Sequence, residues 1–143
     1  MQAFTTRAIL RWVFPLSYAF HNGKTHIAIA LGVKAVETGY NVSFTTMDNL
    51  MYCLKTREIS RGSKWKINRI QSSELVIIVE LGYLPITRDE ANLFFQLISA
   101  LHEQSSLIIT SNKGFKDWTE FLGDAALTTA VFLQNYLPVT ALY

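Results

Sequence analysis

The chain has 143 residues, of which 50% are hydrophobic and 17% are charged, and its formal net charge is +2. This length and apolar content predict one globular domain with its own core and exclude a disordered chain. The small net charge excludes a uniformly basic nucleic-acid binder, so a role of that kind would depend on local clusters of charge. The single cysteine, Cys53, excludes an internal disulfide and a cysteine-rich zinc site. We therefore expect a cytoplasmic protein.

The first apolar run, residues 8–16, is predicted to be a strand rather than a targeting segment. It is interrupted by Arg11 and Pro15, and no A-x-A cleavage motif follows it. It is also far shorter than the roughly twenty apolar residues that a membrane span needs. We expect neither a secretory signal nor association with a membrane.

Along the rest of the chain, apolar runs rich in β-formers alternate with helical patterns. Further strands are predicted at 41–46, 74–81 and 106–112, with a weak one at 138–143, and helices at 25–38, 47–59 and 88–104. The runs LVIIVE and SLIIT are almost continuously apolar, which is typical of strands covered on both faces. Gly39 follows the first helix, and Thr87 with Glu90 forms a capping box at the start of the last. The alternation predicts an α/β fold with a parallel sheet.

The tripeptide Gly23-Lys24-Thr25 opens the first predicted helix. The amino terminus of a helix favours anions through its unpaired N–H groups and its dipole, and a lysine adds a point charge. In a phosphate-binding loop, Lys24 would reach the β- and γ-phosphates, and the Thr25 hydroxyl would ligate Mg²⁺. The complete motif G-x-x-x-x-G-K-[ST] has a glycine at the position occupied here by Tyr18. The sequence therefore predicts an incomplete phosphate loop.

Two later strands end in polar residues that suit the same site. Glu80 ends the run at 74–81, and Asn112 ends the run at 106–112. Open α/β sheets bind their ligands at the carboxyl ends of the strands, so both side chains are expected near the phosphate loop. The residue before Glu80, where a nucleotide site of this kind has a magnesium-holding aspartate, is Val79.

The chain closely resembles the IstB-type transposition helper ATPases, relatives of the helicase loader DnaC in the AAA+ class, in the stretches GKTHIAIALGVKAVETGYNVSFTT, LVIIVELGYLP, FFQLI, LIITSN and FKDWTEFLGD. The resemblance covers about residues 22–130. It implies one partial AAA+ domain over residues 1–143, with the three-layer sandwich of a P-loop NTPase and a mostly parallel sheet, incomplete at both ends. It also implies ATP and Mg²⁺ as cofactors, and DNA, a cognate transposase and further copies of the chain as partners.

Carried over by position, the resemblance assigns specific roles to residues of this chain. Glu80 and Asn112 match the catalytic glutamate and the sensor residue, and Thr25 matches the magnesium-linked threonine. The residues implied to bind the nucleotide are Asn22, Gly23, Lys24, Thr25 and His26.

The chain departs from the family pattern at several of these positions. Tyr18 and His21 replace two glycines, Val79 replaces the aspartate, and Gln134 stands near the place of an arginine. A non-glycine residue forced to positive φ costs on the order of 1 kcal/mol of stability. Loss of a carboxylate that supports a metal ion commonly lowers metal affinity or activity about 10- to 100-fold. We expect a truncated, degenerate copy that binds nucleotide but hydrolyses it poorly. The alternatives are a non-hydrolysing DNA- or protein-binding remnant and a non-functional fragment.

A basic stretch, residues 55–69, contains six basic residues, the single acid Glu58 and the aromatic Trp65. Lysines and arginines would neutralise DNA phosphates, and the indole could stack on a base. The predicted DNA contacts are Lys55, Arg57, Arg61, Lys64, Trp65, Lys66 and Arg69. A charged, solvated surface without a partner is the alternative.

Overall fold

The computed structural model of the protein describes residues 23–82, 85–101 and 104–111. Within these ranges the elements follow one another in the order α1 (Gly23–Glu37), β1 (Val42–Thr46), α2 (Met47–Thr56), α3 (Arg61–Ser72), β2 (Leu75–Leu81), α4 (Arg88–Leu101) and β3 (Ser106–Ser111). The predicted strands at 8–16 and 138–143 lie outside the described residues.

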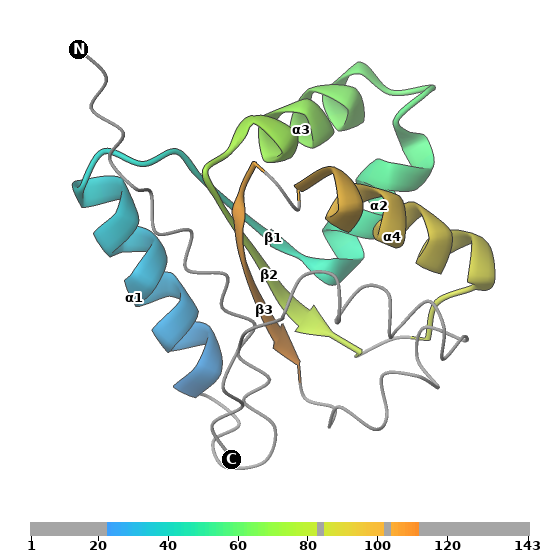
Figure 1. The fold of residues 1–143 in the computed structure, drawn as a ribbon. Helices are drawn as coiled ribbons and strands as arrows, with labels where there is room; N and C mark the ends of the chain where they lie inside the picture. Colours follow the sequence, from blue (N-terminus) through green and yellow to red (C-terminus); the bar gives the residue numbers. More distant parts are fainter. Residues whose placement is uncertain (1–22, 83–84, 102–103, 112–143) are drawn as a thin grey trace.

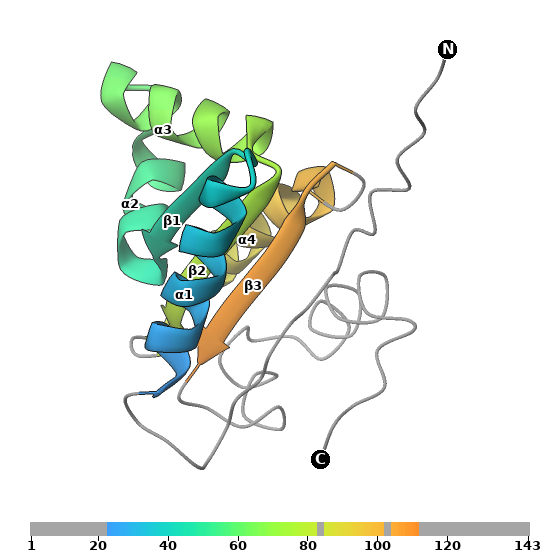
Figure 2. The same cartoon turned by 90° about the vertical axis from the view of Figure 1, so that its left-hand side faces the viewer.

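The three strands form a parallel sheet in the order β1-β2-β3. α1 covers one face of this sheet, and α2, α3 and α4 cover the other (Figures 1 and 2). The predicted three-layer α/β arrangement with a parallel sheet is therefore confirmed in the described part of the chain. None of the described helices combines the length and the apolar character that a membrane crossing requires.

β2 is buried on both faces because its side chains alternate between two clusters. Ile77 and Val79 pack beneath α1, together with Ala28. Val76 and Ile78 point to the opposite face, into a larger cluster. Other members of that larger cluster are Leu50, Ile67, Leu81, Phe94, Leu97, Ile98, Leu101 and Ile109. Burial on both faces explains the unbroken apolar run of this strand in the sequence.

α1 lies close to the sheet because Gly32 faces it. A Cβ atom at this position would stand only 2.8 Å from Cδ1 of Ile77. Glycine within a helix costs about 1 kcal/mol relative to alanine, and close packing against the sheet offsets this cost. The helix is followed by Gly39 at φ +92°, so the predicted glycine stop is confirmed.

α3 is a helix that the sequence pattern did not predict. Its N-cap is Ser60, whose side chain accepts a hydrogen bond from the Ser63 N–H at 3.3 Å. Its buried face consists only of Ser63, Ile67 and Ile70. Such a narrow inward face, beside a mostly charged remainder, gives a weak helical pattern.

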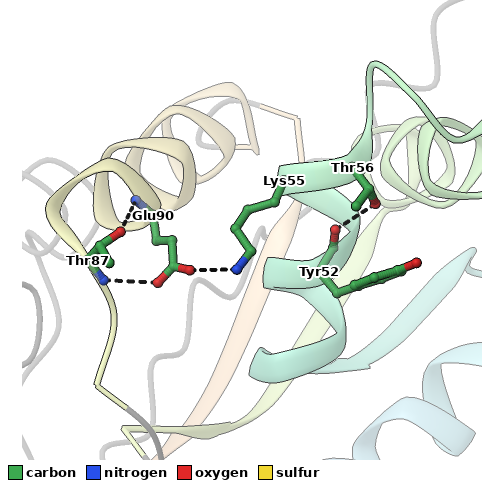
Figure 3. Close-up of polar contacts among 5 residues, drawn as sticks. All are labelled: Tyr52, Lys55, Thr56, Thr87 and Glu90. Atoms are coloured by element: carbon green, nitrogen blue, oxygen red, sulfur yellow. Dashed lines mark hydrogen bonds and ion pairs between the residues drawn. The ribbon is translucent and has the colours of Figure 1, made fainter.

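α2 is tied to both of its helical neighbours by polar contacts. The Lys55 ammonium lies 2.8 Å from Oε1 of Glu90 in α4 (Figure 3). The Thr56 hydroxyl donates to the Tyr52 carbonyl at 2.7 Å and also lies 2.6 Å from the Ser63 hydroxyl in α3. These contacts fix the end of α2 against the other two helices of its layer.

Glu90 also closes the predicted capping box at the start of α4. The Thr87 N–H donates to Oε2 of Glu90 at 2.9 Å, and the Glu90 N–H donates to the Thr87 hydroxyl at 3.2 Å. The hydrogen bond from Lys55, together with that from the Thr87 N–H, holds the pKa of the Glu90 carboxyl below its usual value.

Glu90→Gln is expected to lower the free energy of unfolding at neutral pH by about 0.5 kcal/mol, because it removes the ion pair with Lys55. The folded pKa of Glu90 is depressed, so its contribution to stability is present above the unfolded pKa and is lost as the pH falls through the folded pKa. Urea denaturation of both proteins should show a difference that shrinks below about pH 4.

Glu58→Gln is the matched control, since Glu58 is exposed and contacts only its neighbour Arg57 among the ion pairs of the described residues. It should change the stability little at any pH. A constant difference between the native chain and Glu90→Gln across the acid range would contradict the assigned role of the charge.

Candidate functional site

α1 begins at the carboxyl edge of the sheet, beside the ends of β2 and β3 (Figures 1 and 2). Its first four residues are Gly23, Lys24, Thr25 and His26, and no acidic residue lies in this turn. The N–H groups of a first turn cannot be paired within the helix, and they carry the positive end of its dipole. This end of α1 is therefore suited to an anion such as a phosphate.

The side chain of Lys24 reaches the end of β3. Its Nζ donates to the Ser111 carbonyl oxygen at 3.0 Å. Burial lowers the pKa of the Lys24 ammonium. Because a carbonyl is a neutral acceptor, a phosphate at the start of α1 would be a stronger partner for this ammonium.

Thr25 follows Lys24 in the same turn and is half-buried. The described residues contain no group of three or more histidine, cysteine, aspartate or glutamate side chains that could hold a metal ion. A hydroxyl oxygen such as that of Thr25 is among the oxygen ligands that Mg²⁺ accepts in nucleotide sites.

Glu80 stands near the end of β2 with an exposed side chain and a strained backbone. Its φ is 66°, the one positive φ of a non-glycine residue in the described ranges. The register between β2 and β3 shifts at this point, between Ile78 and Leu81. Gly82 follows at φ +93°. The exposed Glu80 and the irregular backbone around it thus lie at the carboxyl end of β2.

Two hydroxyl groups of β3 hold this irregular end of β2. The Glu80 N–H donates to the Thr110 hydroxyl at 3.3 Å, and the Ser111 hydroxyl donates to the Leu81 carbonyl at 2.6 Å. No role of Thr110 or Ser111 was predicted from the sequence. Two successive hydroxyl residues at the end of an apolar strand could have indicated polar contacts there. Their partners could not be identified, because these depend on the register of the strands.

Val79 is buried beneath α1 with only 2% of its surface exposed. It packs with Ala28 and is in register with Thr46 at the end of β1. The family resemblance implies a magnesium-holding aspartate at position 79, whereas in this chain the side chain at that position makes apolar contacts beneath α1.

Asn22 and Asn112, like Tyr18 and His21, lie outside the described residues.

The seven predicted DNA contacts lie on the α2 and α3 side of the sheet. Lys55 is engaged by Glu90, and the guanidinium of Arg57 lies 3.3 Å from Glu58. The remaining predicted contacts, all on α3, are Arg61, Lys64, Trp65, Lys66 and Arg69. α3 lies toward the amino ends of the strands, away from the first turn of α1 (Figure 1). The basic residues of α3 and the carboxyl edge of the sheet are therefore two separate surfaces.

α3 presents its basic residues in two directions. Trp65, Lys66 and Arg69 line a cavity of about 430 Å³ beside β1. The indole of Trp65 is 60% exposed, and the Arg69 guanidinium carbon lies 5.4 Å from the centre of the ring. Arg61 and Lys64 are exposed but do not belong to this lining.

A parallel sheet between two helical layers, with a Gly-Lys-Thr helix start at its carboxyl edge, defines an AAA+-like P-loop fold. AMPPCP-bound DnaA from Aquifex aeolicus superimposes with a TM-score of 0.66 at 19% identity, covering 80% of this chain and 36% of DnaA. The DnaC helicase loader does so with a TM-score of 0.64 at 22% identity, covering 79% of this chain and 69% of the loader.

The family model of the IstB-like ATP binding proteins matches residues 19–135, and the chain belongs to this family. An IS21 insertion-sequence protein of Pseudomonas aeruginosa, described as ATP-binding, is 45% identical over 109 residues. An IS21-like counterpart from Bacteroides fragilis is 40% identical over 109 residues. Each alignment covers 76% of this chain and 41% of the relative, so the chain spans about two fifths of their length. The resemblance stated from the sequence is confirmed.

Glu80→Gly is expected to raise the free energy of unfolding by about 1 kcal/mol, because glycine adopts a φ of 66° without the penalty of a side chain. Glu80→Ala retains that penalty, so the difference between the two variants in urea denaturation isolates the backbone contribution.

Gln96→Gly, at an exposed position within α4, is the control for the ordinary effect of glycine and should lose about 0.5 kcal/mol. If Glu80→Gly is no more stable than Glu80→Ala, the strained conformation at this position is ruled out.

Proposed function

We propose that the protein is an ATP-binding helper of DNA transposition that binds a magnesium nucleotide at the start of α1, contacts DNA and assists a transposase. The observation that carries the nucleotide site is the position of Lys24, whose ammonium reaches the carboxyl end of β3 from the first turn of α1. Membership of a family of insertion-sequence ATP-binding proteins supports the role in transposition. A neighbour of the same fold, the replication initiator DnaA, has been solved bound to AMPPCP and single-stranded DNA.

In this proposal each residue at the carboxyl edge of the sheet has a separate role. The N–H groups of the first turn and the Lys24 ammonium take the charge of the β- and γ-phosphates. The Thr25 hydroxyl supplies one magnesium ligand, and Glu80 accepts a hydrogen bond from the attacking water. Asn112 would contact the γ-phosphate, and Asn22 and His26 would complete the loop.

Hydrolysis in this chain is proposed to be impaired. A buried Val79 gives the magnesium ion no carboxylate, although a carboxylate there would anchor its water shell. Tyr18 and His21 stand where the family has glycines, which adds a steric penalty in the loop. Nucleotide binding depends mainly on the start of α1 and is proposed to persist.

DNA binding is proposed on the outer surface of α3. Arg61 and Lys64 are exposed there, and neither forms an ion pair among the described residues. Lys55 contributes less because its ammonium is engaged by Glu90. Several copies of the chain side by side would line up α3 helices along one duplex, which would multiply these phosphate contacts.

Lys24→Ala is expected to abolish a weak, magnesium-dependent binding of ATP or ADP, because it removes the cation at the phosphate end of α1. Isothermal titration calorimetry measures this directly.

The native chain in the same solution should release phosphate from ATP at close to the background rate, well below about 1 per second.

Lys34→Ala is the matched control, since Lys34 is an exposed lysine in the last turn of the same helix. It should leave the binding heat unchanged. Either no heat from the native chain at about millimolar nucleotide, or equal heats for both alanine variants, would refute the nucleotide site.

Arg61→Gln combined with Lys64→Gln should flatten the dependence of DNA affinity on salt. If each residue neutralises one phosphate, the slope of log K against log salt falls by up to about two units, at about 0.9 per phosphate on a duplex. Gel-shift titrations at several salt concentrations measure the slope. Lys34→Gln, on the opposite face of the sheet, controls for net charge. Unchanged slopes in the double variant would favour the solvated surface instead.

A further inference from the structure

β1 is an edge strand of the described sheet, paired only with β2. A strand directs the N–H and C=O groups of alternate residues to either side, so the outer edge of β1 has backbone groups that β2 cannot satisfy. Two cavities of about 430 Å³ and about 450 Å³ lie along this edge and share Val42 and Arg69 as lining residues. We call these two adjoining cavities together the β1 groove.

The two walls of the β1 groove differ in chemistry. The wall formed by α3 carries Trp65, Lys66 and Arg69. Neither Lys66 nor Arg69 belongs to an ion pair among the described residues, and no acidic residue is in the lining of either cavity. This wall therefore offers two cations and an aromatic ring to whatever enters.

The opposite wall is apolar and lies on the α1 side of the sheet. Phe44 is in register with Ile77, which packs beneath α1, so Phe44 shares that face. The end of α1 and the turn after it contribute Val36 and Tyr40. All three side chains are substantially exposed, at 49% for Phe44, 59% for Val36 and 46% for Tyr40.

We propose that the β1 groove binds an extended peptide of a partner protein, with alternating acidic and apolar residues, which adds to β1 as a further strand. Side chains of a strand alternate between its two faces, so one set would meet Lys66 and Arg69 and the other would cover Phe44 and Tyr40. The five residues of β1 match a peptide segment of about five residues, roughly 17 Å long.

A peptide fits this groove better than a nucleic acid does. Phosphates provide only acceptors, so they cannot satisfy the outward carbonyl groups of β1, whereas a peptide backbone supplies donors and acceptors in the required alternation. The site lies beside α3 and away from the start of α1, so the binding goes beyond the proposed function and does not depend on a nucleotide.

Fluorescence anisotropy of a labelled eight-residue peptide with alternating glutamate and valine tests the proposal on the full chain. The peptide is expected to bind, and a lysine–valine peptide is expected not to. Two further peptides carry N-methyl groups on all glutamate amides or on all valine amides. One of these sets faces β1 in an added strand and the other faces solvent, so one methylated peptide should lose binding and the other should keep it.

Variants of the chain locate the bound peptide. Lys66→Glu combined with Arg69→Glu should weaken binding of the glutamate–valine peptide at least about tenfold, because like charges would then face each other. Lys64→Glu makes the same kind of charge change on α3 outside the lining and should retain binding. Circular dichroism of each variant checks that α3 is intact.

Four results would overturn the proposal. The first is no binding of the glutamate–valine peptide at about millimolar concentration, and the second is an equal loss of affinity for both methylated peptides. The third is that Lys64→Glu weakens peptide binding as much as the double variant does. The fourth is that an oligomer of eight thymidines binds more tightly than the peptide. The last result would assign the groove to single-stranded nucleic acid, for which Trp65 offers a stacking surface.

Discussion

The parallel pairing of β2 with both of its neighbours is the constraint on which the rest of the structure depends. Parallel strands need crossover connections, and here α2 with α3 forms one crossover and α4 forms the next. The crossovers cover one face of the sheet, which leaves the other face to α1. The same pairing brings all three carboxyl ends to one edge, where the first turn of α1 meets the irregular end of β2.

Local patterns in the sequence predicted those features that depend on nearest neighbours. The unbroken apolar run of β2 indicated burial on both faces, and Thr87 with Glu90 indicated the start of α4. α3 was not predicted because only three of its residues face inward and Gly62 lowers its helix propensity. The contact between Glu80 and Thr110 could not be predicted either, since it requires the shifted register of two strands that are distant in the sequence.

The sheet separates two surfaces whose chemistry differs. At the carboxyl edge, Lys24 reaches the end of β3 and Glu80 has a positive φ, whereas Val79 beneath α1 contributes apolar packing. The α3 surface carries exposed cations and the indole of Trp65, while the buried residues of this helix are Ser63, Ile67 and Ile70. The first surface lies at the start of α1 and the second on α3, and these two helices cover opposite faces of the sheet.

The close approach of α1 at Gly32 has a mechanical consequence for the edge where the helix begins. A helix rises about 1.5 Å per residue, so Gly32 lies about 12 Å along the axis from Lys24. A Cβ atom added at position 32 would stand 2.8 Å from Cδ1 of Ile77, so either this flexible end of the Ile77 side chain shifts or the helix moves away from the sheet. Where the helix moves, its first turn moves with it, so the residue at position 32 can change the spacing between that turn and the strand ends from about 12 Å away.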